Sequence, residues 1–420
     1  MIKLISFKDY IYVDGGVCAA KGFKAGGVCC GLRHEGASEE KVTGKNDLAA
    51  IYAECSCSAA AVYTTNKVKG APILVTKKHL EDGNARAVIV NSVNANCCNK
   101  DGEEKAEKMC ALLAEALDID ENDVIVASTG VIGQTLPIEP IASAMDNLVQ
   151  VLSEDGNDSA CNAIMTTDTF PKQLAVEFKL GDKKCRIGGM IKGSGMIHPN
   201  MATTLTFLTT DCAISSDMLH TALLNVIKKT LNCVSVDGDT STNDMVCVMA
   251  SGLSGNKPIR DDGADYHIFE NALFALLLNF ARYTARDGEG ATRLIECAVL
   301  EAENEDEALT VAKSVIMSSL FKAAMFGGDA NWGRILCAIG YSGADIEPEK
   351  ISVTLSSTAG RLLVCKDGAG VPFSEEEAKK LLEQEEIRVT VTLGRGTAAA
   401  TAWGCDLTYN YVKINGDYRS

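Results

Sequence analysis

The sequence predicts a layered α/β protein in which helices cover β-sheets. Strand-like runs rich in Val, Ile and Thr recur along the chain, and segments of helical periodicity lie between them. The two kinds of element are mixed without the strict alternation that is typical of a doubly wound sheet. At 420 residues the chain exceeds the size at which one hydrophobic core usually stops growing, so two domains or two closely packed halves are expected.

The predicted strands are short apolar runs bounded by Gly, Asn or Asp. Their β-branched residues favour a pleated, half-buried conformation. In chain order they are residues 61–68, 73–76, 87–91, 124–128, 174–180, 205–210, 245–250, 351–355 and 387–393.

The predicted helices follow from apolar residues that recur every three or four positions and from capping signals. Asn304 with Glu307, and Ser374 with Glu377, have the spacing of N-terminal capping boxes. From Ala308 onward, one helical face is apolar or small as far as Ala323. The other predicted helices are residues 103–117, 138–152, 217–231 and 266–283.

The charge balance argues against nucleic acid and membrane partners. Lys and Arg total 40 against 56 Asp and Glu, a formal net charge of −16 that repels phosphate backbones and anionic lipid. The first residues lack a secretory signal, and the longest apolar stretch, residues 272–281, is too short to span a bilayer. We therefore expect a soluble, cytoplasmic protein.

The 17 cysteines do not have the spacing of a metal site. Zinc ribbons and iron–sulfur sites need two-residue gaps between thiolates, and no Cys-x-x-Cys occurs. Several cysteines, such as Cys247 and Cys337, lie in apolar runs, so buried, reduced thiols are expected. Asp237 and Asp239 begin like a calcium loop, but Thr242 replaces its glycine and Val248 its bidentate Glu. No Walker or Rossmann motif is present. The sequence thus predicts no metal and no cofactor.

One segment, KGSGMIHPNMATTLTFLTTD at residues 192–211, combines a turn-rich approach with a strand. Glycines at 189, 193 and 195 precede a strand that opens at Thr203 or Thr204. Such an approach can hold a hydroxyl side chain in a strained, exposed position. Threonine at the start of a strand is also an ordinary β-former. The pattern by itself leaves both interpretations open.

The literal motifs closely resemble those of the ornithine acetyltransferase (glutamate N-acetyltransferase) family. Members carry Lys-Gly-Ser-Gly-Met-Ile followed by Pro-Asn-Met-Ala-Thr, as residues 192–203 nearly do. The resemblance runs over nearly the whole chain. It includes ASTGVIG (127–133), MTTDT (165–169), VDGDTSTND (236–244), RDGEGAT (286–292), NWGRILCAIGYSG (331–343) and YVKINGDYRS (411–420).

The resemblance implies a fold and a division of the chain. The fold is an α/β/β/α sandwich like that of the DmpA-type proteins, with a smaller C-terminal α+β portion. Self-cleavage between Ala202 and Thr203 would give an α segment, residues 1–202, and a β segment, residues 203–420. The smaller portion would occupy the β segment from about residue 291. The enzyme would then be an assembly of two α and two β segments, a heterotetramer.

The resemblance also implies the catalytic group. Thr203 is the nucleophile, and its freed α-amine, with an ordinary pKa of about 7.7–8.0, is the base that a weakly nucleophilic hydroxyl needs. Thr129 and Gly130 form the oxyanion hole for the tetrahedral intermediate. Without the resemblance, an ordinary turn after a strand is the better interpretation, because Ser-Thr-Gly is a common sequence.

Substrate contacts implied by the resemblance are Thr166, Lys192, Thr203, Glu289, Asn415 and Ser420. A cation for a carboxylate, a carboxylate for an ammonium, and amide and hydroxyl groups suit an N-acetylated amino acid. Lys192 and Glu289 are equally typical of solvated surface charges, and a chain end is usually frayed. A site that needs Ser420 therefore requires an anchored C-terminus.

The implied reaction is a ping-pong acetyl transfer of arginine biosynthesis. The acetyl group passes from N2-acetyl-L-ornithine to Thr203, ornithine leaves, and L-glutamate accepts the acetyl group to give N-acetylglutamate. Acetyl-CoA is an additional donor in some family members. Two alternatives stay open: an aminopeptidase or amidase of the same architecture, and an uncleaved binding protein without catalysis.

The chain departs from the family pattern at three places. Val93 stands where the family usually has Gly, His198 where it usually has a small residue, and Gly-Gly-Asp-Ala (327–330) precedes NWGR. Val93 is expected to perturb a glycine-dependent turn, and His198 to alter the cleavage rate. A structural or incidental role is expected for His198 rather than catalysis.

Overall fold

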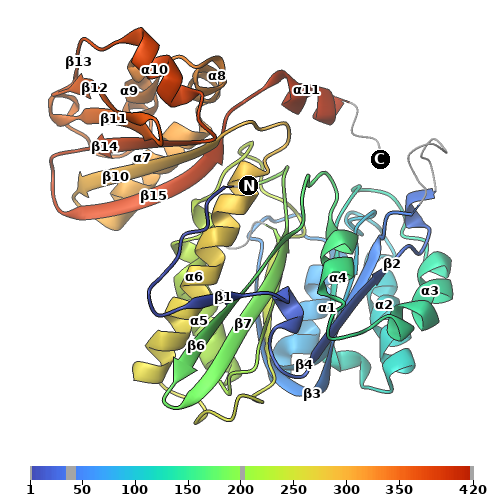
Figure 1. Cartoon of the computed structure of the whole chain (residues 1–420). Coiled ribbons are helices and arrows are strands. Elements are labelled where there is room, and N and C mark those ends of the chain that lie inside the picture. Colours follow the sequence, from blue (N-terminus) through green and yellow to red (C-terminus); the bar gives the residue numbers. More distant parts are fainter. Residues whose placement is uncertain (1, 35–43, 199–203, 417–420) are drawn as a thin grey trace.

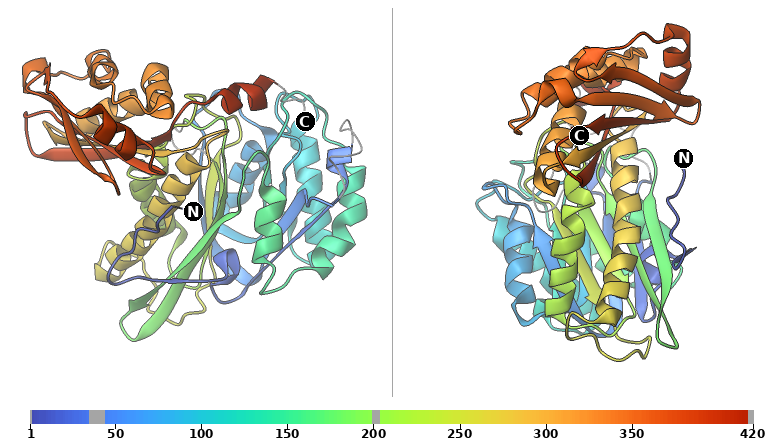
Figure 2. Two further views of the ribbon diagram at one scale, coloured as in Figure 1. Left: turned by 45° about the horizontal axis from the view of Figure 1, so that its top comes forward. Right: turned by 90° about the vertical axis from the view of Figure 1, so that its left-hand side faces the viewer.

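The computed structural model describes residues 2–34, 44–198 and 204–416. Two β layers lie face to face, with helices on both outer sides, and a smaller portion of the chain stands at one end (Figures 1 and 2). The two layers share hydrogen bonds through one long strand, so they form a single nine-stranded sheet in the order β1-β6-β7-β8-β9-β3-β4-β5, with β2 paired to β3.

The first layer contains the strand that follows the glycine-rich segment. Its strands are β1 (Ile11–Val13), β6 (Lys172–Leu180), β7 (Lys183–Lys192), β8 (Leu205–Thr210) and β9 (Met245–Ala250). β6 and β7 form an antiparallel pair, β7 and β8 are antiparallel, and β8 and β9 are parallel. All six residues of β8 and of β9 are buried, so these two strands form the centre of the layer.

The long strand β3 (Leu48–Tyr63) belongs to both layers. Its first part pairs with β2 (Phe23–Val28) and β4 (Asn84–Asn91), and β4 continues to β5 (Val124–Ser128). Its last six residues pair with β9 in the other layer. The register with β4 shifts between Tyr52 and Cys57, where the strand changes partners. The inner faces of both layers then pack together, with Ile51 and Val88 in one cluster with Phe207 and Met249.

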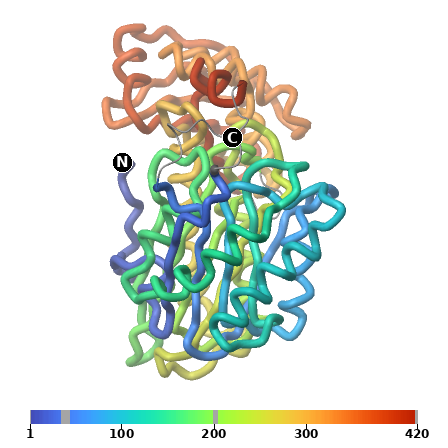
Figure 3. Tube along the Cα trace, turned by 90° about the vertical axis from the view of Figure 1, so that its right-hand side faces the viewer, coloured from blue at the N-terminus to red at the C-terminus, as the bar shows by residue number. Residues whose placement is uncertain are grey.

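Helices cover the two outer faces. α5 (Ser216–Lys228) and α6 (Ala264–Arg286) pack on the β6–β9 layer, and α1 (Ala71–His79), α2 (Gly102–Leu117) and α3 (Glu139–Gln150) pack on the other (Figures 1 and 3). α4 (Asn157–Ile164) packs against β2 and β3 and contributes to the interior between the layers. The predicted α/β/β/α fold class is confirmed.

The smaller portion has its own sheet and core. Its strands, in the order β13-β12-β11-β14-β10-β15, are β10 (Leu294–Ala302), β11 (Ser352–Ser357), β12 (Gly360–Lys366), β13 (Ala369–Gly370), β14 (Glu386–Thr392) and β15 (Ala398–Cys405). Its helices are α7 (Glu305–Met317), α8 (Ser319–Gly327), α9 (Trp332–Gly340) and α10 (Glu375–Leu382). The last helix, α11 (Tyr409–Gly416), returns toward the end of the sandwich (Figure 1).

The structure differs from one predicted strand and one predicted helix, and it shows the reason in each case. The predicted strand 73–76 lies in α1, because Pro72 stands in the first turn of that helix, where its missing N–H costs nothing. The single apolar helix running to Ala323 is broken, because the Ser318 hydroxyl accepts from the Phe321 N–H at 3.3 Å and starts α8 anew. Both predicted capping boxes are confirmed: Asn304 and Ser374 accept from the backbone N–H three residues on.

The expectation of buried, reduced cysteines is met at most of them but not at every one. In the described parts of the chain no disulfide is present and most cysteines are buried, but Cys337 is exposed because its face of α9 points away from the core. No group of three or more potential metal ligands occurs among the described residues. No single helix there is long and apolar enough to cross a membrane, while α7 and α8 meet those criteria only as a pair bent by 59°.

Candidate active site

A small cavity of about 20 Å³ lies where β7 ends and β8 and β9 begin. Its lining includes Thr129, Lys192 and Thr204, so two of the predicted site residues meet beside the start of β8. Thr203, the predicted nucleophile, and Ala202 lie outside the described residues. The full lining is Thr129, Lys192, Gly193, Gly195, Met196, Ile197, Thr204, Leu205, Ser241, Asn243 and Asp244.

Sheet register explains why these residues meet. Leu205 pairs with Lys192 on one side and with Met245 on the other, and the Met245 N–H donates to the Thr204 carbonyl at 2.9 Å. The beginning of β8 therefore lies beside the residues that precede β9, including Asn243. Central strands of a buried layer fix this register strongly, because a one-residue slip would turn every apolar side chain to the wrong face.

The predicted oxyanion residues form a tight turn after β5. The Thr129 N–H donates to the Asn91 carbonyl and the Val131 N–H to the Val93 carbonyl, both at 3.0 Å. Gly130 has φ +131°, and a Cβ there would lie 2.0 Å from the Val93 carbonyl oxygen, so only glycine fits. No described residue accepts a hydrogen bond from the Gly130 N–H. The Gly130 N–H is therefore a hydrogen-bond donor without an acceptor among the described residues.

Val93 contacts this turn through its carbonyl. It is absent from the described non-glycine residues with positive φ, so its backbone conformation does not require glycine. Its side chain packs against the core beneath α2 and α3. The backbone at Val93 therefore gives no sign of a conformation that needs glycine.

Asn243 connects the start of β9 by hydrogen bonds to the turn that carries Thr129 and Gly130, which we call the oxyanion turn. Its Nδ2 donates to the carbonyls of Ala95 at 2.6 Å and Ser128 at 2.9 Å, and its Oδ1 accepts from the Thr242 hydroxyl at 2.6 Å. Ser128 directly precedes Thr129, so this buried amide positions the turn. The sequence prediction missed this role, although Asn243 lies within the VDGDTSTND motif.

Glu289 and Asn415, two of the predicted substrate contacts, are in contact with each other. The Asn415 Nδ2 donates to Glu289 Oε2 at 2.7 Å, and the Glu289 N–H donates to the Ser194 carbonyl at 2.9 Å. Glu289 is only 7% exposed. A Cβ on Gly195 would lie 2.4 Å from the Glu289 carboxylate, so glycine permits this close approach. Ser420 lies outside the described residues.

A buried ion cluster holds the loops that carry these groups. The Lys172 ammonium pairs with Asp168 at 2.7 Å and with Asp287, and all three side chains are fully buried or nearly so. Asp168 also accepts from the N–H of Gly193 at 2.8 Å and of Thr166 at 3.0 Å.

The two carboxyl groups of this cluster have pKa shifts of opposite direction. Burial acts to raise the pKa of Asp168, but the Lys172 and Lys192 charges hold that pKa well below its usual range. Burial raises the pKa of Asp287 in spite of Lys172. The cluster thus joins MTTDT, KGSG and RDGEGAT, and it was not predicted because no local pattern marks a contact between such distant segments.

The predicted contacts Thr166 and Lys192 differ in their surroundings. The Thr166 carbonyl accepts from the Lys45 ammonium at 3.3 Å, and its side chain is half-buried. Lys192 is half-buried at the end of β7 and makes no ion pair with a described residue. It also lines the cavity at the start of β8.

His198 is a neutral side chain beside the site. Burial, assisted by the Lys313 charge, lowers the pKa of His198 to about 4. Its Nδ1 lies 3.2 Å from the Ser235 hydroxyl, and its carbonyl accepts from the Thr240 hydroxyl at 2.6 Å. These contacts fix the strand-like segment that leads toward the predicted cleavage point.

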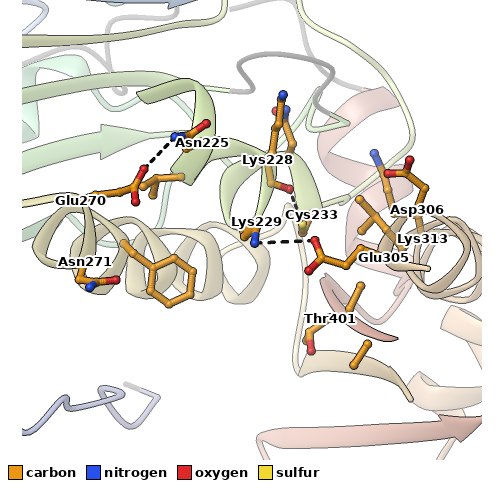
Figure 4. Close-up of a pocket in the computed structure, with 16 residues that line it drawn as sticks. Asn225, Lys228, Lys229, Cys233, Glu270, Asn271, Glu305, Asp306, Lys313 and Thr401 are labelled. Carbon is orange, nitrogen blue, oxygen red and sulfur yellow. Dashed lines mark hydrogen bonds and ion pairs between the residues drawn. The ribbon is translucent and has the colours of Figure 1, made fainter. Parts of the chain in front are cut away.

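A larger cavity of about 850 Å³ lies elsewhere, between α5, α6, α7 and β15 (Figure 4). Lysines and carboxylates line it, with Lys229 and Glu305 paired at 3.7 Å and Asn225 bound to Glu270 at 2.8 Å. None of the predicted site residues lines it. It is separate from the cavity at the start of β8.

Comparison with known proteins identifies relatives over the full length. "Arginine biosynthesis bifunctional protein ArgJ 1" of Clostridium acetobutylicum is 48% identical, covering 95% of this chain and 96% of that protein. The "Arginine biosynthesis bifunctional protein ArgJ" of Bacillus cereus is 47% identical, with both chains covered completely. A crystal structure of the ArgJ protein from Bacillus halodurans is 45% identical, with a TM-score of 0.48, and covers 50% of this chain and 97% of that one.

The family model of ArgJ matches residues 24–420. Together with relatives of nearly 50% identity over the whole length, this match confirms the resemblance and the enzyme class predicted from the motifs. The chain belongs to the ArgJ family, the ornithine acetyltransferases of arginine biosynthesis.

Proposed function

We propose that this chain is a glutamate N-acetyltransferase that moves acetyl from N2-acetyl-L-ornithine to L-glutamate through an acetyl-Thr203 intermediate. The observation that carries the proposal is the meeting of Thr129 and Lys192 with Thr204, the residue after the predicted nucleophile, around one cavity. An oxyanion donor, a cation and the start of the β8 strand are the parts that acyl transfer to a threonine needs.

Self-cleavage is the first proposed step. The Thr203 hydroxyl attacks the Ala202 carbonyl, the peptide nitrogen leaves as the new α-amine, and water hydrolyses the resulting ester. The freed amine then lies two bonds from the carbon that bears the nucleophilic hydroxyl, and it serves as general base.

Acetyl transfer follows in two halves. The Thr203 Oγ attacks the acetyl carbonyl of N-acetylornithine, its proton passes to the α-amine and on to the leaving ornithine amine, and acetyl remains on Oγ. The α-amine of glutamate then attacks the ester carbonyl, the bond from that carbon to Thr203 Oγ breaks, and the proton lost by the glutamate amine returns to Oγ through the Thr203 α-amine, which releases N-acetylglutamate. The N–H of Gly130, which donates to no described residue, and the Thr129 hydroxyl are the proposed donors to the oxyanion of both tetrahedral intermediates.

Substrate recognition is assigned to charged groups around the cavity. The Lys192 ammonium suits the substrate carboxylate, and Glu289, held by Asn415, suits an ammonium. Thr166 and Ser420 complete the proposed set. The buried Asp168 and Lys172 hold Thr166 and Gly193 in place, which keeps these contacts rigid.

Acetyl-CoA is a proposed second donor, because the relatives are named bifunctional proteins. No cofactor is needed in this scheme. The two segments of the cleaved chain are proposed to assemble as two α and two β pieces in the cytoplasm.

The test combines intact mass and product analysis. Purified protein is expected to consist of pieces 1–202 and 203–420, and Thr203→Ala to remain one chain. Acetyl transfer from N-acetylornithine to glutamate, with and without acetyl-CoA, gives N-acetylglutamate if the proposal is right. Free acetate alone would indicate a hydrolase, and an uncleaved inactive chain would indicate a binding protein.

A further inference from the structure

Asp244 is a buried carboxylate, and one of its oxygens accepts no hydrogen bond from a described residue. It directly precedes β9, lines the cavity at the start of β8, and is 4% exposed. Ser241 hydrogen bonds to the carboxyl, yet Oδ2 is buried without a hydrogen-bond partner in the described chain. Leaving a buried charged oxygen unpaired is costly, so such an atom points to an absent partner.

Neighbouring side chains do not supply that partner. The Thr204 hydroxyl is engaged with the Thr206 hydroxyl at 2.7 Å, and the Asn243 amide donates to the carbonyls of Ala95 and Ser128. Lys192 lines the same cavity, but no ion pair within 4.0 Å joins it to Asp244. The ionised form of Asp244 needs a donor at Oδ2, preferably a cation.

Charge in the cavity favours a cation as well. Burial raises the pKa of Asp244 well above its usual value, and the Lys192 charge and the Ser241 hydrogen bonds offset this only in part. Asp237, from the same loop, acts in the raising direction. The Glu289 carboxylate, from the loop after α6, lies against Gly195, which lines the same cavity. A second positive charge beside Oδ2 would stabilise the ionised carboxylate.

We propose that Asp244 binds a primary ammonium group in this cavity through Oδ2 and is thereby a further functional residue of the site. This inference rests on the proposed function and deepens it. Two amines have the required chemistry: the α-amine that cleavage would free at Thr203, and the free amino group of the amino-acid substrate. The register of β8 and β9 favours the first, because it brings Asp244 beside Thr204.

The Asp244 carboxylate shifts the pKa of the bound amine in one direction. A carboxylate beside an amine favours the ammonium form and raises the pKa of that amine. The amine acts as a base only when neutral, so Asp244 moves the acid limb of the rate profile to higher pH. Asp244→Asn keeps the shape, removes the charge, and is expected to move this limb to lower pH.

The experiment measures kcat and kcat/KM for acetyl transfer from pH 5 to 9 in wild type, Asp244→Asn and Asp244→Ser. A limb that moves down by about half a pH unit or more, with kcat lowered on the order of 10-fold, assigns the ammonium to Thr203. A raised KM for N-acetylornithine or glutamate with an unmoved limb assigns it to the substrate. An unmoved limb together with unchanged KM and kcat in both variants overturns the inference.

Asp211→Asn is the matched control. Asp211 is also a buried aspartate with a raised pKa, just past the far end of β8, but its oxygens accept from the Arg186 and Lys21 N–H groups. Its loss is expected to lower the melting temperature and to leave the pH limb in place. Wild type is weighed by mass spectrometry first. If it is a single 420-residue chain, the proposed function fails, and that result is distinct from an unchanged Asp244 variant.

Discussion

Gly195→Ala tests how closely the Glu289 carboxylate, the proposed partner of the substrate ammonium, is held. A Cβ at this position would lie 2.4 Å from Cδ and Oε2 of Glu289 and 2.5 Å from Oε1. Ordinary contacts begin near 3.4 Å, so the carboxylate must move by about 1 Å. Glu289 has little room to do so, because it is buried, accepts from Asn415 at 2.7 Å, and is tied by its own N–H to Ser194.

A displacement of about 1 Å in a positioning group costs up to about 100-fold in rate. We therefore expect Gly195→Ala to lower kcat/KM for N-acetylornithine about 10- to 100-fold, chiefly through KM, while the chain still yields both pieces. Steady-state assays and intact mass measure the two effects separately. Gly327→Ala, where a Cβ meets nothing within 4 Å, is the control and should change neither. Unaltered kcat/KM in Gly195→Ala would refute the assignment of Glu289 to substrate binding.

Three further perturbations probe the surrounding structure. Lys172→Met leaves Asp168 and Asp287 buried without their cation, and urea unfolding should show a loss of about 3–5 kcal/mol; a loss below 1 kcal/mol would contradict the ion cluster. Asn243→Ala removes the donor to the Ser128 carbonyl, directly before Thr129, and the donor to the Ala95 carbonyl. It should lower kcat about 10- to 1000-fold with KM little changed, whereas a raised KM with an unchanged kcat would speak against a positioning role. His198 has a pKa of about 4 in the folded chain against an ordinary value near 6.5, so the unfolded chain binds more protons between these two pH values. The free energy of unfolding therefore falls as pH drops through that window. His198→Gln should flatten this part of the curve of melting temperature against pH.

Local patterns were sufficient to predict much of the fold. Helices with caps, such as those that begin after Asn304 and Ser374, were found because a side chain three residues before an N–H is a purely local signal. The strand β7 was missed, since Gly188 and Gly189 interrupt its apolar pattern. These glycines are present because β7 is closely approached: a Cβ on Gly188 would lie 1.9 Å from the Gly16 carbonyl oxygen.

The candidate site was harder to predict because its parts meet only through tertiary structure. Family motifs pointed to Thr129, Lys192 and Glu289, but no spacing along the chain indicates that Asn243 reaches Ser128, 115 positions away. The same holds for Lys172 and Asp287. Asp244 lies in a motif whose carboxylates suggested a calcium loop, and no pattern in the sequence marks its buried Oδ2, which has no hydrogen-bond partner among the described residues.

The sheet order decides what self-cleavage would do to the protein. The α segment supplies β7 and β3, and the β segment supplies β8 and β9, which lie between them. β8 pairs with β7 over six residues, and β9 pairs with β3 over another six. A cut before Thr203 would therefore leave each piece hydrogen-bonded to the other on both sides of the central strands. Neither piece can leave without opening the buried centre of the sandwich, so cleavage can free an amine for catalysis while the fold remains whole.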